Sequence, residues 1–369
     1  MRSLSVSLRD FGLEMQGPKK RERIRIEDDD YPRHRLAEMV FSNLGLMHLV
    51  APYFPRTIKT DFPVESRFRN LITAMYAADQ QSPPVFRAPR RNWNWPEIPK
   101  TDTQRVAVAF SAGKDSLWNV WWAQERYGPE NVLAVHLGGL NLGQKSQEAA
   151  YAVRQSRELG FRIQMIRLLN SSQNHGYRVM RSRDMFLAGL IVPVALEFGA
   201  GRIIIEGCSS GQPEMYFTER AENFQLFNRI LKDLGIPVRV GWRLREEIDV
   251  VRDLLKHRPE WLALVCNCFS AACYKPFLRR SWAKRAPTIP LYESQCGSCI
   301  KCRTVNLARV LYDPALQASD PEDIRTFLIS TRRWMRENRE KMADIMGETF
   351  GNAFNRAVRR YGLNHLAVA

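Results

Sequence analysis

The chain has 369 residues, enough for two domains, and its 45% hydrophobic and 25% charged residues are typical of an ordinary globular protein. No apolar run approaches the roughly 20 residues that span a bilayer, and residues 1–30 lack a signal-peptide core, so we expect a cytoplasmic protein. The net charge of +16 suits contact with nucleic acid, binding of anionic substrates or solubility alone.

The first hundred residues are predicted to form a separate region (1–100), a basic and partly helical extension. The mixed-charge run at residues 17–30 is typical of a solvated arm. Apolar residues recur at helical spacing over residues 36–44 and again over 68–75. Residues 80–100 hold several prolines and arginines and are predicted to form a linker.

In residues 101–260, short apolar runs alternate with helical stretches. This alternation is typical of βαβ units, in which crossover helices join parallel strands. We therefore predict an α/β fold with an open parallel sheet and helices on both faces. The predicted strands span residues 106–110, 132–136, 162–166 and 203–205, and the predicted helices span residues 117–127, 146–159 and 185–198.

The rest of the chain is predicted to form two further regions. Residues 261–312 form a cysteine-rich, zinc-binding segment, and residues 313–369 form a C-terminal helical extension. In that extension Asp320 and Pro321 suit a helix N-cap and first turn, and an amphipathic pattern follows over 324–346.

A short polar loop follows the first strand of the α/β region, where Phe110 precedes Ser-Ala-Gly-Lys-Asp-Ser at residues 111–116. Ligands bind beyond the carboxyl ends of parallel strands, and small residues let backbone N–H groups approach a phosphate at a helix N-terminus. A Walker P-loop is excluded, because Val108 stands where it needs glycine and Asp115 where it needs Ser or Thr. The alternative is an ordinary turn in which Asp115 and Ser116 cap the helix.

The loop resembles the S-G-G-x-D-S signature of the PP-loop ATP pyrophosphatase superfamily and departs from it only by Ala112 in place of a glycine. The resemblance implies that ATP is bound and activates a substrate oxygen by adenylation or related chemistry. Lys114, Asp115 and Ser116 would be catalytic, with Asp115 holding Mg²⁺ on the phosphates or shaping the loop. The implied ATP-binding residues are Phe110, Ser111, Ala112, Gly113, Lys114, Asp115, Ser116, His136 and Gly207.

Cys296, Cys299 and Cys302 have the C-x-x-C-x-x-C spacing at which thiolates converge on one metal ion, and we predict Zn²⁺. An iron–sulfur cluster also takes four cysteines, and a set of buried reduced thiols is a further alternative. The cysteines that could supply the fourth ligand are Cys266, Cys268 and Cys273.

A PP-loop followed by C-G-x-C-x-x-C resembles the 7-cyano-7-deazaguanine synthase family, over about residues 105–310. That family converts 7-carboxy-7-deazaguanine, ammonia and ATP into the nitrile and carries a structural zinc. Residues 265–269 are similar to the family's T-x-S-C-Y segment, which implies Cys268 as the fourth zinc ligand. The substrate-binding residues that the resemblance implies are Arg181, Arg183 and Arg220.

Some features depart from the family pattern. Basic residues interleaved with tryptophan at 275–285 and 332–339 suit nucleic acid, a protein partner or a solvated helix face. The acidic residue that the family often places after Gly207 is missing, which leaves the acceptor open. Three functions are considered: an ATP-dependent C–N ligase in deazaguanine metabolism, nucleic-acid modification or antiphage defence; a PP-loop tRNA thiolase; and a non-catalytic nucleotide-binding module. We also expect a homo-oligomer and no membrane partner.

Overall fold

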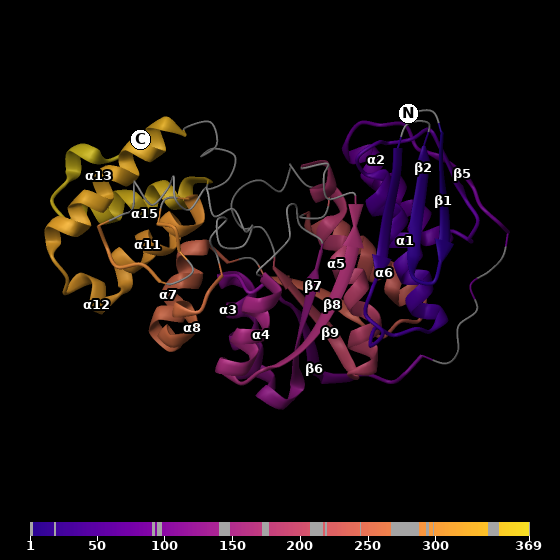
Figure 1. Ribbon diagram of the computed structural model, residues 1–369, viewed down its shortest axis with the longest axis horizontal. Coiled ribbons are helices and arrows are strands. Elements are labelled where there is room, and N and C mark those ends of the chain that lie inside the picture. Colours follow the sequence, from indigo (N-terminus) through magenta and orange to yellow (C-terminus); the bar gives the residue numbers. More distant parts are fainter. Residues whose placement is uncertain are drawn as a thin grey trace.

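In the computed structural model, ten strands of the described part of the chain form one sheet (Figure 1). The strand order is β10-β9-β6-β7-β8-β3-β2-β1-β4-β5. The residues that the structure describes are 3–17, 20–90, 93, 98–139, 148–171, 177–206, 217, 220–243, 245–266, 288–292, 295–297, 299–338 and 347–368.

Parallel strands make up the half of the sheet that the alternating pattern predicts. Val106 and Val108 of its central strand face one hydrophobic core, and Ala107 and Ala109 face the other, so this strand is buried on both faces. The fifth strand, β10, was not predicted from the sequence. The parallel strands are β6 (Asp102–Ala109), β7 (Val132–Gly138), β8 (Arg162–Asn170), β9 (Ala200–Glu206) and β10 (Arg239–Arg243).

The N-terminal region continues this sheet, and the expectation of a solvated arm is wrong for residues 20–26. They form β3, which pairs antiparallel with β8, placing Ile24 opposite Asn170. Ile24 and Ile26 are buried, while Arg21, Arg23 and Arg25 at the alternate positions are exposed. The charged segment therefore has the two-residue period of a strand. The N-terminal strands are β1 (Ser3–Arg9), β2 (Gly12–Gly17), β3 (Lys20–Ile26), β4 (Thr57–Thr60) and β5 (Val85–Arg87).

Helices cover both faces of the sheet, which confirms the predicted α/β class. One group of helices shares a core with the N-terminal strands, and the other shares a core with the C-terminal helices. The proposed domain boundaries stay a prediction. The first group is α1 (Arg35–Val50), α2 (Ser66–Ala78), α5 (Tyr177–Glu197) and α6 (Ala221–Asp233), and the second is α3 (Lys114–Tyr127), α4 (Glu148–Leu159), α7 (Glu247–His257) and α8 (Pro259–Ala263).

Helices of the C-terminal region gather at the end of the molecule opposite the N-terminal strands (Figure 1). Asp320 caps α13 and Pro321 is its first residue, as predicted, but the helix ends at Glu337. Residues 339–346 lie outside the described residues, and no described helix is long and apolar enough to cross a membrane. The remaining elements are α11 (Ile300–Tyr312), α12 (Pro314–Gln317), α13 (Pro321–Glu337), α15 (Gly347–Arg360) and the short 3-10 helices Pro129–Asn131 and Asn364–Leu366.

A buried polar cluster joins the N-terminal helix α1 to the α/β region. His48 Nδ1 lies 2.9 Å from Ser182 Oγ of α5, and His48 Nε2 lies 3.3 Å from Asn170 Nδ2 of β8. The imidazole also stacks on Phe186, with ring centroids 4.9 Å apart. A Ser–His pair can be catalytic, but all of these groups are buried, so this cluster connects structural elements.

Burial, helped by the charge of Arg183, lowers the pKa of His48 to about 3. In the unfolded chain a histidine titrates near pH 6.5, so the unfolded chain binds the proton before the folded one does. Above pH 6.5 the neutral His48 therefore stabilises the fold, and this contribution is lost as the pH falls. Between pH 7.5 and 5 we expect this residue to account for a loss of about 2 kcal/mol in the free energy of unfolding. Urea unfolding of His48→Asn should show a correspondingly weaker pH dependence, whereas His365→Asn, at an exposed position, should not.

Candidate nucleotide and metal sites

The polar loop of residues 111–116 links the end of β6 to the start of α3, as the sequence predicts. Gly113 is the N-cap residue of α3, and no side chain caps this helix in the described residues. Ser116 Oγ instead accepts from Ser111 N at 3.1 Å and donates to Gly113 O at 3.1 Å. In the described residues, neither Asp115 nor Ser116 therefore caps the helix, as the alternative of an ordinary turn would require. As far as the described residues go, the first N–H groups of α3 are available for an anion.

Ala112 holds a backbone conformation that favours glycine, with φ at 60°. A non-glycine residue in this left-handed region costs about 1–2 kcal/mol, so the surrounding structure has to impose it. The carbonyl of buried Ala112 accepts from Gln155 Nε2 and from Cys266 N, both at 3.0 Å. Gln155 Nε2 also donates to Leu264 O at 2.7 Å, so α4 and the chain after α8 both hold the loop in place.

Lys114 is buried at the first turn of α3, with only 2% of its side chain exposed. Its Nζ lies 2.5 Å from Asp115 Oδ2 and 3.3 Å from Glu247 Oε2; the second contact is an ion pair without hydrogen-bond geometry. Burial lowers the pKa of Lys114, but the negative charges of Asp115, Glu247 and Glu206 together raise it by more. The pKa of Lys114 is therefore well above its usual range. Lys114 therefore stays charged at physiological pH.

Glu206 ends β9 at the same edge of the sheet as the loop. Its side chain is exposed at the surface, but the surrounding protein removes water from around the carboxylate. This desolvation is the main cause of a pKa well above the usual range. Asp115 and Glu247 raise this pKa further, while Lys114 and Lys301 lower it. The charges of Asp115, Glu247, Lys114 and Lys301 therefore influence Glu206, and Lys301 belongs to the cysteine-rich segment.

His136 lies on β7 next to the loop, and its Nδ1 is 2.9 Å from Phe110 O. Burial lowers the pKa of His136 and outweighs this hydrogen bond, so the ring is neutral and Nδ1–H is the donor. Its buried Nε2 has no hydrogen-bond partner among the described residues. Gly207, the other predicted ATP-binding residue outside the loop, is not among the described residues.

The three arginines predicted to bind substrate lie on the helices that face the N-terminal core. Arg181 Nε donates to Asp79 Oδ1 at 2.7 Å, and Arg183 Nε donates to Asp184 Oδ1 at 2.8 Å. Arg220 is the N-cap residue of α6. Their role in substrate binding stays a prediction.

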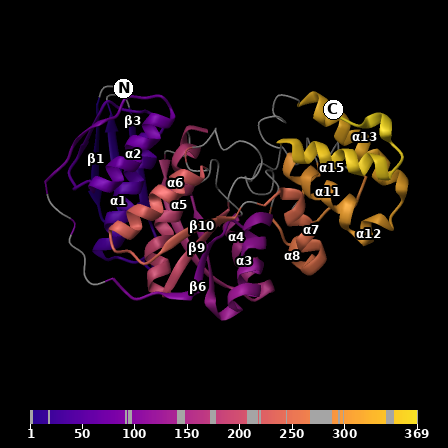
Figure 2. The same cartoon turned by 180° about the vertical axis from the view of Figure 1, so that it is seen from behind.

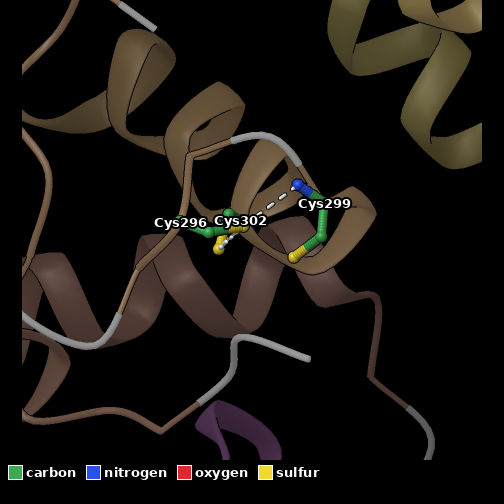
Figure 3. A group of neighbouring side chains, drawn as sticks. All are labelled: Cys296, Cys299 and Cys302. Atoms are coloured by element: carbon green, nitrogen blue, oxygen red, sulfur yellow. Dashed lines mark hydrogen bonds between the residues drawn. The ribbon is translucent and has the colours of Figure 1, made fainter. Parts of the chain in front are cut away.

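Three buried cysteines converge at the start of α11 (Figure 3). The sulfur atoms of Cys296, Cys299 and Cys302 all lie within 4.8 Å of one another, and those of Cys296 and Cys302 are 3.9 Å apart. Cys299 N donates to Cys296 Sγ at 3.3 Å, and Gly297 turns the chain between them with φ at 73°. Tetrahedral zinc sites need sulfur atoms at about this separation, so the donor set fits a metal ion.

The fourth ligand is not assigned by the described residues. Cys266 does not join the group of three sulfur atoms, and its backbone N–H binds the loop at Ala112 instead. Cys268 and Cys273 lie outside the described residues. Buried Arg303 follows the cluster and donates to Thr331 Oγ1 at 2.9 Å. Burial lowers the pKa of Arg303 to about 10 although the three thiols raise it, so a positive charge beside them favours thiolates.

Sequence reasoning missed Gln155, Glu206 and Glu247, three residues that surround the loop. Glu206 carries the clearest signal, since it directly follows the apolar residues of β9 and the carboxyl ends of parallel strands meet at one edge. The family resemblance directs attention to an acid after Gly207, whereas Glu206 directly precedes it. Gln155 and Glu247 lie on helices far along the chain and carry no local signal.

No protein-family model matches this chain, and no curated protein matches it. Among the solved structures that match is a glutamine-dependent NAD+ synthetase from Acinetobacter baumannii in complex with adenosine diphosphate, at 13% sequence identity. The match covers 64% of each chain, so this chain spans less than two thirds of that protein, and the TM-score is 0.21.

Proposed function

We propose that this chain is an ATP-dependent ligase of the PP-loop type. The observation that supports it is the uncapped N-terminus of α3, preceded by small residues and adjoined by a buried, charged Lys114. Free N–H groups and the helix dipole would bind phosphate oxygens, and Lys114 would compensate charge that develops on them. Ser111 and Ser116 would offer hydroxyl groups to the same phosphates.

Mg²⁺ fits the same edge of the sheet, because Asp115 and Glu206 place carboxylates beside the loop and Mg²⁺ prefers oxygen ligands. Such an ion would stabilise the charged form of Glu206 and neutralise the phosphates. The residues of the chain would do the rest: Lys114 and the loop orient the nucleotide, and the ion pairs to Asp115 and Glu247 hold Lys114 in place.

The chemistry that we propose has two steps. A carboxylate oxygen of the acceptor attacks the α-phosphorus of ATP, and pyrophosphate leaves with the electrons of the broken P–O bond. Ammonia or an amine then attacks the activated carbonyl, loses a proton and displaces AMP, which gives an amide. Where ammonia is the donor, a second round gives the nitrile: the amide oxygen attacks the α-phosphorus of another ATP, pyrophosphate leaves, and the oxygen departs with AMP as the nitrogen loses two protons. The family resemblance of the loop and the cysteines makes a 7-carboxy-7-deazaguanine-like carboxylate the first acceptor to test.

The three thiols would hold a structural zinc ion, with Cys268 as the proposed fourth ligand. Four cysteines leave no open position on the metal, so its contribution would be stability. The segment also carries Lys301 toward Glu206 and the loop, so zinc binding would order one side of the nucleotide site. Nothing in the described residues favours a thiolase or a non-catalytic module over the ligase.

The experiment that tests this function is mass spectrometry of products after incubation with ATP, ammonium and 7-carboxy-7-deazaguanine. We expect the nitrile together with AMP, and a turnover at least about 100-fold lower for Asp115→Asn than for Asp233→Asn, an exposed position. ATP cleavage without the nitrile would indicate a macromolecular acceptor. Absence of ATP binding in calorimetry would make the proposal wrong.

A further inference from the structure

Strand β10 is the edge strand of the parallel half of the sheet (Figure 2). A cluster of arginines lies along this strand and beside the tryptophans of α3. All but Arg243 are exposed, and Arg243 is half-buried. We refer to this cluster as the arginine strip. Its members are Arg126, Arg202, Arg239, Arg243 and Arg245.

The sheet register explains why the arginines share one face. Arg239 of β10 lies opposite Arg202 of β9, and the strands stay in register up to Arg243. Between them, Val240 and Trp242 turn to the other face, where they pack into the core beneath α6. Side chains alternate along a strand, so the arginines of β9 and β10 face the side of α3.

Helix α3 forms one wall of the strip. Trp118, Trp122 and Arg126 follow one another at four-residue spacing and therefore lie on one face of the helix. The Arg243 guanidinium carbon lies 3.3 Å from the Trp122 ring centroid and 5.1 Å from that of Trp118. Arg245 lies 5.5 Å from the Trp118 ring, and Arg126 lies 5.8 Å from the Trp122 ring.

Charge in the strip is poorly compensated. Among the described residues, four of the five arginines form no ion pair with a carboxylate, and Arg245 pairs with Asp253. Arg202 Nη1 donates to the hydroxyl of Tyr127 at 2.5 Å, which fixes its position without neutralising it. Burial lowers the pKa of Arg243, and the nearby Arg245 and Arg126 lower it further. Like charges held this closely are costly until an anion joins them.

The strip is long enough for several phosphates. From Arg239 to Arg243, the edge strand β10 extends about 13 Å, at about 3.3 Å per residue. Gly241 leaves the middle of β10 without a side chain, and α3 packs on β6, β7 and β9 but not on β10 among the larger contacts of the described residues. An arginine stacked on an aromatic ring keeps its N–H edge free to bind phosphate.

We propose that the arginine strip binds the backbone of a single-stranded nucleic acid. The successive phosphates of a flexible single strand can follow the exposed arginines along β10, and their negative charge is complementary to the strip. The strip runs along β10 to Arg243, which lies opposite Glu206, so a bound strand would pass close to the phosphate loop. The inference goes beyond the proposed function and does not depend on ATP chemistry.

The test is fluorescence anisotropy of labelled oligothymidylate and oligouridylate with the full-length, zinc-loaded chain, without ATP, over a series of salt concentrations. The variant combines Arg126→Gln, Arg202→Gln and Arg239→Gln and leaves the Arg243 stack intact. Each lost phosphate contact should reduce the slope of log affinity against log salt by about 0.7, so the triple variant should lose about 2. Its affinity at low salt should fall at least tenfold.

A matched variant with Arg87→Gln, Arg157→Gln and Arg325→Gln removes the same charge from exposed arginines elsewhere. It should keep the wild-type slope. An equal loss in both variants, no binding by the wild-type chain, or displacement of the oligonucleotide by polyglutamate at equal charge would each overturn the proposal. Asp115→Asn should bind the oligonucleotide normally, so the failure of the ligase function and the failure of this proposal are distinguishable.

Discussion

Replacing Lys114 with methionine is expected to lower the free energy of unfolding by about 3 kcal/mol, even without nucleotide. The ammonium group is buried and lies between Asp115 and Glu247, with Glu206 close by. Its removal leaves carboxylates with no opposite charge in a crowded part of the protein, which costs more than the ion pairs themselves contribute. Urea unfolding at neutral pH measures the difference.

Two further variants show whether the cause is charge. Lys256→Met, at an exposed position on α7, should change the free energy of unfolding by less than about 0.5 kcal/mol. Adding Glu247→Gln to Lys114→Met should recover about 1 kcal/mol, because it removes one of the uncompensated carboxylates. If Lys114→Met unfolds like the wild-type chain, the lysine is not held between carboxylates.

Cys302→Ser is expected to abolish tight zinc binding and to lower the free energy of unfolding by more than about 4 kcal/mol. Cys302 is fully buried at the start of α11, and α11 packs against α7 and α15. Losing the metal should therefore disturb the whole C-terminal group of helices. The measurements are metal content of the purified protein and its urea unfolding.

Cys266→Ser is the control, because Cys266 does not join the sulfur cluster. It should keep one zinc per chain. Zinc retained by Cys302→Ser, or iron with labile sulfide in anaerobically purified protein, would contradict the assignment of a zinc site.

Local sequence signals predicted the parts of the site that lie close together in the chain. The loop at residues 111–116 follows from a strand, small residues and a helix in the right order. Cys296, Cys299 and Cys302 come together because two-residue spacings fold back within a turn. In both cases the chemistry and the geometry are encoded in fewer than ten residues.

Parts that depend on long-range pairing were not predictable from one sequence. The strand β3 was hidden because its exposed positions are charged, and the residue that it faces, Asn170, lies far along the chain. Gln155 and Glu247 reach the loop only because α4 and α7 pack on the same face of the sheet. The arginine strip likewise exists only through the register of β9 and β10.

The pairing of β3 with β8 also has a consequence for synthesis of the chain on the ribosome. Ile26 is made 142 residues before its partner Leu168. At about 5–20 residues per second, the open edge of β3 waits roughly 7–30 s for a strand to pair with. Unpaired edges recruit other chains, and exposed charges discourage this. The arginines at alternate positions of β3 would thus reduce aggregation of the nascent chain until β8 has been synthesised.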